Sequence, residues 1–136
     1  MSFLDITNVA SSVQPIDCVP GGEYKVEIVY AKIDEAKGYM MLILEIPEII
    51  SAKSVSLMLN LPGSGRTPKE ENSNNNRLLE FFTCFGLSTS RPYAEDAQYP
   101  EGLIGATGWV LLSDPKDDGK GYGEQNKVLK FVNSAR

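Results

Sequence analysis

The sequence predicts an all-β domain with one short helix, arranged as the five-stranded Greek-key barrel called the OB-fold. Three apolar, strand-like runs come first, then a single amphipathic helical segment, then two more strand-like runs. Five strands with one helix between the third and fourth is the serial order of that barrel. The length of 136 residues is enough for one such domain with a hydrophobic core.

Two regions are expected within the chain. Residues 1–20 are predicted to be an irregular N-terminal arm, because Pro15 and Pro20 interrupt any regular pattern. Residues 21–136 are predicted to form the barrel domain, which opens on a pair of glycines. No internal repeat or second apolar cluster indicates another domain.

Five segments have the apolar pattern of β-strands. They span residues 23–33, 39–46, 54–61, 103–112 and 126–132. In the first segment, Tyr24 and Tyr30 share the apolar side of a period-two alternation, so both are expected in the core or at the barrel rim. The third segment alternates cleanly, which predicts one buried face and one open face bearing Ser56, Met58 and Asn60.

The helix is predicted over residues 77–85, between the third and fourth strands. Asn76 or a neighbouring asparagine is the expected N-terminal cap, and Gly86 is placed to end the helix. The residues before it, 62–76, are rich in proline, glycine and asparagine and are predicted to be a long irregular connector. The broad apolar stripe of the helix is expected to close one end of the barrel.

The composition argues against catalysis. The chain has no histidine, which removes the commonest general base and the commonest metal ligand. Cys18 and Cys84 are far apart in the sequence and do not form a metal-binding pair. Carboxylates lie in polar segments that would not hold an acid and a base at a fixed distance. A protein without enzymatic activity, metal or other cofactor is therefore expected.

The charge and hydropathy restrict the partners of the protein. No apolar run approaches the roughly 20 residues of a membrane helix, so no membrane partner is expected. The N-terminal residues lack the pattern of a secretory signal, which favours a cytoplasmic location. The net charge of −5 argues against a protein that coats nucleic acid through bulk positive charge.

The polar excursion between the last two strands is the strongest candidate for a binding site. It sets Lys116, Lys120 and Tyr122 among glycines and leads to Lys127 and Lys130 on the last strand. Flexible backbone, cations for phosphates and a ring for stacking are what sequence-tolerant binding of a nucleic-acid strand requires. The alternative is a solvated hairpin tip whose acids cancel its lysines.

Further candidates lie on the strands and in the connector before the helix. Trp109 would stack a base if it is exposed, and would belong to the core if it is not. Tyr39 begins the second strand beside the first connector, where exposure is expected. Arg66 would contact a phosphate or remain solvated. On the third strand, Ser56, Met58 and Asn60 would contact a ligand through hydrogen bonds and a flexible apolar side chain. The alternative is that this face is simply exposed to solvent.

Four blocks of the sequence resemble a family of bacteriophage proteins regarded as single-stranded DNA-binding OB-folds. The blocks are residues 1–5 leading to 19–26, residues 77–82 with 85–87, residues 103–110, and residues 122–128. The resemblance rests on their order along most of the chain. It implies a role in phage DNA replication or recombination, in the cytoplasm of an infected bacterial host. It gives no list of DNA-contacting residues.

Together these observations predict a non-enzymatic, largely sequence-independent single-stranded DNA-binding protein. Its lysines would hold the DNA backbone, while Tyr39, Trp109 and Tyr122 would stack on bases. To reconcile this with the net charge, the lysines are expected to line one groove while acidic residues face away from it. Those acids are Glu70, Glu71, Glu95, Asp96 and Glu101.

Other readings remain open. Replication or recombination proteins are expected as further partners, and an exposed edge strand would also allow a homodimer. The main alternative function is an OB-fold module for protein–protein interaction, or a structural accessory module, with no nucleic-acid ligand. Evenly scattered lysines and a buried Trp109 would favour this alternative.

Overall fold

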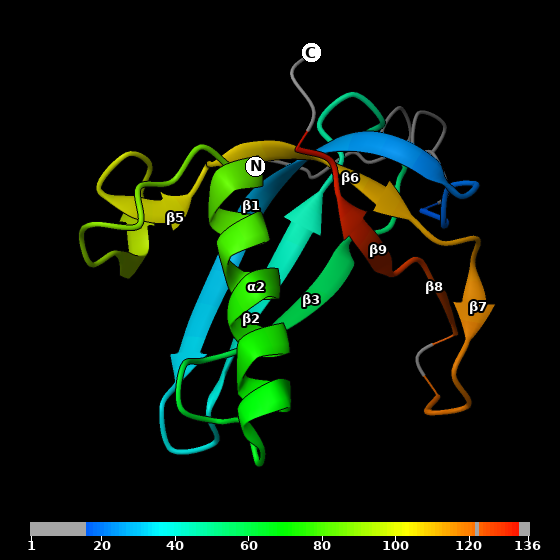
Figure 1. Ribbon diagram of the computed structural model, residues 1–136. Helices are drawn as coiled ribbons and strands as arrows, with labels where there is room; N and C mark the ends of the chain where they lie inside the picture. Colours follow the sequence, from blue (N-terminus) through cyan, green and yellow to red (C-terminus); the bar gives the residue numbers. More distant parts are fainter. Residues whose placement is uncertain (1–15, 122, 134–136) are drawn as a thin grey trace, which may run out of the picture.

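The structure is a computed structural model, and it describes residues 16–121 and 123–133 of the chain. A five-stranded antiparallel sheet dominates it, in the order β3-β2-β1-β6-β9 (Figure 1). The five strands are β1 (Gly22–Asp34), β2 (Tyr39–Glu45), β3 (Val55–Asn60), β6 (Thr107–Leu112) and β9 (Val128–Phe131). The sheet curls into a half-barrel. The prediction of a mostly β protein with one helix in the domain is thereby confirmed for this part of the chain.

Helix α2 (Pro68–Cys84) lies across the open side of the half-barrel (Figure 1). The two outer strands, β3 and β9, each pair with only one neighbour within the described residues. They are not hydrogen-bonded to each other, and α2 contacts both of them. The helix therefore covers the gap that is left between the two edges of the sheet.

The helix begins much earlier than the sequence analysis predicted. It starts at Pro68, and the asparagine-rich stretch assigned to the connector forms its first turns. Thr67 is the N-terminal cap, because its hydroxyl accepts a hydrogen bond of 3.1 Å from the backbone N–H of Glu70. Proline is well suited to the first helical position, where its missing N–H costs nothing. The predicted cap at Asn76 is therefore wrong.

The predicted end of the helix is confirmed. Phe85 is the C-terminal cap, and Gly86 follows it with a φ of +67°. The N–H of Leu87 then reaches back to the carbonyl of Phe82 over 2.8 Å. A left-handed residue followed by this backbone bond is the usual way in which a helix ends at glycine.

The predicted fourth strand is divided in two. β5 (Gly102–Ile104) and β6 are separated by a bend at Gly105, which has a φ of +96°. β5 pairs in parallel with β4 (Ala94–Gln98), which lies in a segment to which the sequence analysis assigned no strand. At Gly102 a Cβ atom would lie 2.2 Å from the carbonyl oxygen of Ala97, so only glycine fits this close pairing.

A bulge in β1 reverses the expected orientation of Tyr30. The pairing of β1 with β2 shifts register between Ile28 and Tyr30. The inward positions therefore change from Ile28 to Ala31, and Tyr30 points outwards with 45% of its surface exposed. The prediction that Tyr30 belongs to the core or rim is wrong. Tyr24, before the bulge, packs against the core, and its hydroxyl donates a 2.6 Å hydrogen bond to the Pro20 carbonyl.

The core lies between the inner face of the sheet and α2. Phe81 is fully buried, and its ring centroid is 4.8 Å from that of Phe85 and 5.8 Å from that of Phe131 on β9. Gly108 on β6 allows α2 to approach closely, since a Cβ atom there would lie 2.9 Å from the Cys84 carbonyl oxygen. These contacts fix the helix against the curled sheet.

Candidate nucleic-acid interface

The side of the sheet that faces away from α2 and the core is called the outer face here. Its first half, on β1, β2 and β3, combines rings, sulfur atoms and polar groups. The residues are Tyr30, Lys32, Tyr39, Met41, Ile43, Ser56, Met58 and Asn60. The register places Lys32 opposite Met41 and Met41 opposite Met58, which is 57% exposed. Exposed rings and methionine side chains of this kind can accept the faces of bases.

The predicted residues of β2 and β3 therefore lie together on one surface. Tyr39 is opposite Asn60, and Ser56 is opposite Ile43. Asn60 also donates a 3.2 Å hydrogen bond from Nδ2 to Oδ1 of Asn74 on α2, at the edge of the strip. Tyr30 and Met41 belong to the same surface but were not predicted to do so.

The second half of the outer face lies where β1, β6 and β9 meet. Lys25 on β1 is opposite Trp109 on β6, and Leu111 is opposite Lys130 on β9. Trp109 is 38% exposed, so it is not a residue of the core. Its ring and the lysines on the two neighbouring strands are the types of group that hold a base and its phosphates.

Cys84 fixes the backbone beneath Trp109. Its thiol donates a 3.1 Å hydrogen bond to the carbonyl oxygen of Trp109 from the end of α2. Burial raises the pKa of the Cys84 thiol, and hydrogen bonds with the backbone of Val132 and Trp109 oppose this effect. The thiol is thus a half-buried structural group that ties α2 to β6.

Two acidic residues separate the halves of the outer face. Glu27 on β1 is directly opposite Glu45 on β2, and Glu45 is exposed. Like charges on opposite residues of neighbouring strands repel each other and also repel a phosphate. The sequence analysis did not anticipate this pair, because the two residues meet only through the register of β1 and β2.

The polar excursion forms a hairpin of β7 (Lys116–Asp117) and β8 (Glu124–Gln125) beyond the edge of the sheet (Figure 1). Lys116, Lys120 and Lys127 are exposed on the hairpin and at its base, and Lys130 follows on β9. The prediction for Tyr122 falls outside the described residues. The hairpin therefore adjoins the half of the outer face that bears Trp109.

Asn126 anchors the base of this hairpin. It is only 3% exposed, and its Nδ2 atom donates hydrogen bonds of 2.8 Å to the carbonyls of both Val19 and Ser113. Its Oδ1 atom accepts a 3.1 Å bond from the Val19 N–H. Lys53 adds a further tie, since its Nζ atom donates to the Glu124 carbonyl over 2.9 Å. The sequence analysis assigned Asn126 no role other than the start of the last predicted strand.

The acidic residues of the hairpin hold backbone groups. Asp114 accepts a 2.9 Å hydrogen bond from the Gly21 N–H and so joins the hairpin to the start of β1. At the tip, Asp117 and Asp118 accept bonds of 2.8 and 3.0 Å from the N–H groups of Gly119 and Lys120. These carboxylates order the hairpin, although their charges remain close to its lysines.

Replacement of Asn126 by alanine is expected to lower the free energy of unfolding by about 2 kcal/mol or more, because buried backbone groups lose their partners. Urea denaturation followed by circular dichroism measures this change. The matched control is Asn133→Ala, which removes one exposed 3.3 Å hydrogen bond to the Glu80 carbonyl. An equal, small effect of the two substitutions would contradict the anchoring role.

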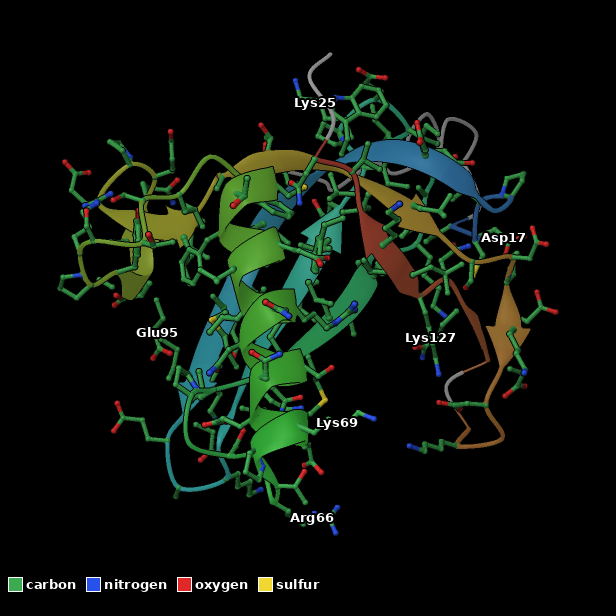
Figure 2. All side chains as sticks on the ribbon, viewed as in Figure 1. Asp17, Lys25, Arg66, Lys69, Glu95 and Lys127 are labelled. Atoms are coloured by element: carbon green, nitrogen blue, oxygen red, sulfur yellow. The ribbon has the colours of Figure 1, made fainter. Side chains whose placement is uncertain are left out.

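A second loop region lies at the other end of the molecule. The turn between β1 and β2 joins the segment after β3 through a 2.9 Å hydrogen bond from the Leu61 N–H to the Gly38 carbonyl. The two loops enclose a hollow of about 650 Å³ that includes Lys37. Arg66 is exposed on the same segment, and Figure 2 shows it well apart from Lys127. The structure thus does not bring Arg66 to the hairpin lysines.

The acids predicted to face away from the lysines lie in two regions of the structure. Glu70 and Glu71 are in the first turn of α2, where Glu71 accepts hydrogen bonds from the N–H groups of Gly63 and Gly65. The remaining acids, Glu95, Asp96 and Glu101, lie on or beside the β4–β5 pair. Figure 1 shows that pair and the β7–β8 hairpin on opposite sides of α2.

Comparison of the sequence with protein-family models finds no match, and a search of curated proteins also finds none. The resemblance to phage proteins therefore remains a prediction from the residues of this chain. Within the described residues, no helix is long and apolar enough to span a membrane.

Proposed function

We propose that this chain is a non-enzymatic, largely sequence-independent single-stranded DNA-binding protein. In this proposal the half-barrel is a Greek-key barrel of the OB type, with α2 between its third and fourth barrel strands, β3 and β6. The observation that carries the proposal is the outer face. There the exposed rings of Tyr30 and Trp109 lie on a curled sheet near lysine side chains.

Each part of the outer face has a role in this proposal. Trp109 and Tyr30 stack on bases, and such contacts contribute about 1–3 kcal/mol per base in strand-binding proteins. Lys25 lies opposite Trp109, and Lys130 lies opposite Leu111, two residues further along β6. Both lysines contact the phosphates. Met58 supplies an adaptable apolar contact on the other half. None of these contacts reads the identity of a base, so binding depends little on sequence.

The small number of cations limits the electrostatic part of the binding. The chain has a net charge of −5. Five lysines of the proposed site lie on the half of the outer face that bears Trp109 or on the adjoining hairpin. They are Lys25, Lys116, Lys120, Lys127 and Lys130. If all five contact phosphates, the logarithm of the binding constant falls with the logarithm of salt concentration with a slope of about −3.5. A basic coating protein would have a steeper slope.

The test is a titration with oligothymidine at low salt. Trp109 is the only tryptophan, so stacking on it should quench the intrinsic fluorescence of the protein. Quenching is expected to saturate at micromolar protein and to weaken as salt is raised. Oligouridine and duplex DNA serve as competitors, and the duplex should compete poorly. Absence of quenching and of binding at micromolar protein would contradict the proposal.

The biological setting that we propose is support of DNA replication or recombination during phage infection of a bacterium. Proteins of those processes would be further partners. One observation favours the alternative of a protein-interaction or structural module without nucleic acid. The net charge is acidic, and Glu27 and Glu45 lie in the middle of the outer face. The same titration distinguishes the two functions.

A further inference from the structure

A second surface feature lies on α2, on the opposite side of the sheet from the outer face. It is a groove of about 320 Å³ between α2 and the segment that follows the helix. Its lining includes Pro62, Leu78, Leu79 and Phe82, and Leu79 is 51% exposed. An apolar stripe of the helix therefore continues from the core to the solvent, which costs free energy unless a partner covers it.

The polar groups of the groove indicate what kind of partner fits. Among the described residues, Arg91 is the only charged residue of the lining, and its guanidinium carbon lies 4.3 Å from the centroid of the Tyr93 ring. No carboxylate pairs with Arg91 in the described part of the chain. Stacking on the ring holds the guanidinium in place without neutralising its charge. An anionic group is thus the complement of this rim.

Asn75 gives a second, independent indication of the kind of partner that fits the groove. It lines the same groove, and its Oδ1 atom is buried without a hydrogen-bond partner among the described residues. A buried acceptor that lacks a partner destabilises the folded protein. A ligand with an N–H group removes this cost, after rotation of the Asn75 side chain towards the groove.

We propose that the groove binds a short acidic peptide segment of a partner protein. One apolar side chain of the peptide packs between Leu79 and Phe82, a neighbouring carboxylate pairs with Arg91, and a backbone N–H is donated to Asn75. A nucleic-acid strand does not fit this chemistry, because the lining offers a single cation and a mostly apolar surface. The proposal does not depend on DNA binding at the outer face.

The experiment measures fluorescence anisotropy of a fluorescein-labelled peptide with the full chain. The probe contains two aspartates followed by leucine and phenylalanine. One control peptide has lysines in place of the aspartates, and another has serines in place of the two apolar residues. We expect saturable binding of the acidic probe with a Kd below about 100 μM and at least about tenfold weaker binding of both controls.

Two substitutions locate the binding to the groove. Leu79→Gln keeps a good helix former at an exposed position, and Arg91→Glu reverses the charge of the rim. Each is expected to weaken peptide binding about tenfold. The matched controls are Leu129→Gln, at a 58% exposed leucine on β9, and Lys37→Glu, at an exposed lysine in the β1–β2 turn. Both controls should bind the peptide like the unchanged protein.

Oligothymidine binding is measured in parallel and should be unaffected by Leu79→Gln. Four results would overturn the proposal. The acidic probe does not bind, or it binds equally well to the groove variants and the controls. Alternatively, Leu79→Gln weakens oligothymidine binding as strongly as peptide binding, which would make the groove a nucleic-acid surface. Finally, sedimentation shows a dimer that Leu79→Gln dissociates, so that a second copy occupies the groove.

Discussion

Replacement of both Trp109 and Tyr30 by alanine is expected to weaken oligothymidine binding by about 2–6 kcal/mol, since each stacked base contributes about 1–3 kcal/mol. The two rings lie on different halves of the outer face, with β1 as the strand that joins them. Because their cross-strand partners differ, Ile43 for Tyr30 and Lys25 for Trp109, their single effects should add. Anisotropy of labelled oligothymidine measures the loss, since the double variant has no tryptophan.

Tyr99→Ala is the matched control for this experiment. Tyr99 is 47% exposed, like Tyr30, but it lies beside the β4–β5 pair and not on the outer face. Its removal should leave the affinity within about twofold. If the double variant binds as tightly as this control, the outer face is not the DNA-binding surface.

Replacement of Phe81 by alanine is expected to lower the free energy of unfolding by about 3–5 kcal/mol, the range for deletion of a buried aromatic side chain. The ring is fully buried and contacts three other rings, including Phe131 on β9. Its loss leaves a cavity where α2 meets the edge of the sheet. Urea denaturation measures the change in the midpoint.

Leu79→Ala serves as the control on the same helix. Leu79 is 51% exposed, so its truncation should cost far less than that of Phe81. Phe81→Leu provides a milder variant if the alanine protein does not fold, and its loss should be intermediate. Equal effects at positions 79 and 81 would mean that α2 packs on the sheet through a different face.

The features that could be predicted from the sequence are those that depend only on residues close together in the chain. The clean period of β3 fixed which of its side chains are exposed, and Met58 was found on the open side as expected. The end of the helix was equally clear, because Gly86 is the residue type that a left-handed φ requires. In both cases one local rule is sufficient and nothing distant competes with it.

The start of the helix was missed because two local signals disagree. Asparagine and serine have low helix propensity, which argued for a connector before residue 77. Thr67, Pro68 and Glu70 form a capping signal at the true start, and the carboxylate of Glu71 holds the preceding loop. The cap and the tertiary packing outweigh the propensity of the asparagines.

The candidate site was predicted only in part, because its composition depends on pairing between strands. The bulge after Ile28 brings Tyr30 to the outer face. Its one trace in the sequence is the run of four apolar residues from Ile28 to Ala31, which interrupts the period-two alternation. Asn126 has no such trace, since its partners Val19 and Ser113 are distant in the chain. Register and long-range hydrogen bonds cannot be read from one sequence.

The carboxylates of Glu27 and Glu45 affect how a single nucleic-acid strand would bind along the outer face. They lie between the two halves of the outer face and would repel phosphates there. An oligonucleotide would therefore bind through two short stretches, one on each half, with an unfavourable segment between them. Affinity would then rise in a step once an oligonucleotide is long enough to reach both stretches. Shorter fragments would exchange rapidly, and release of a long strand could begin at either stretch while the other still holds.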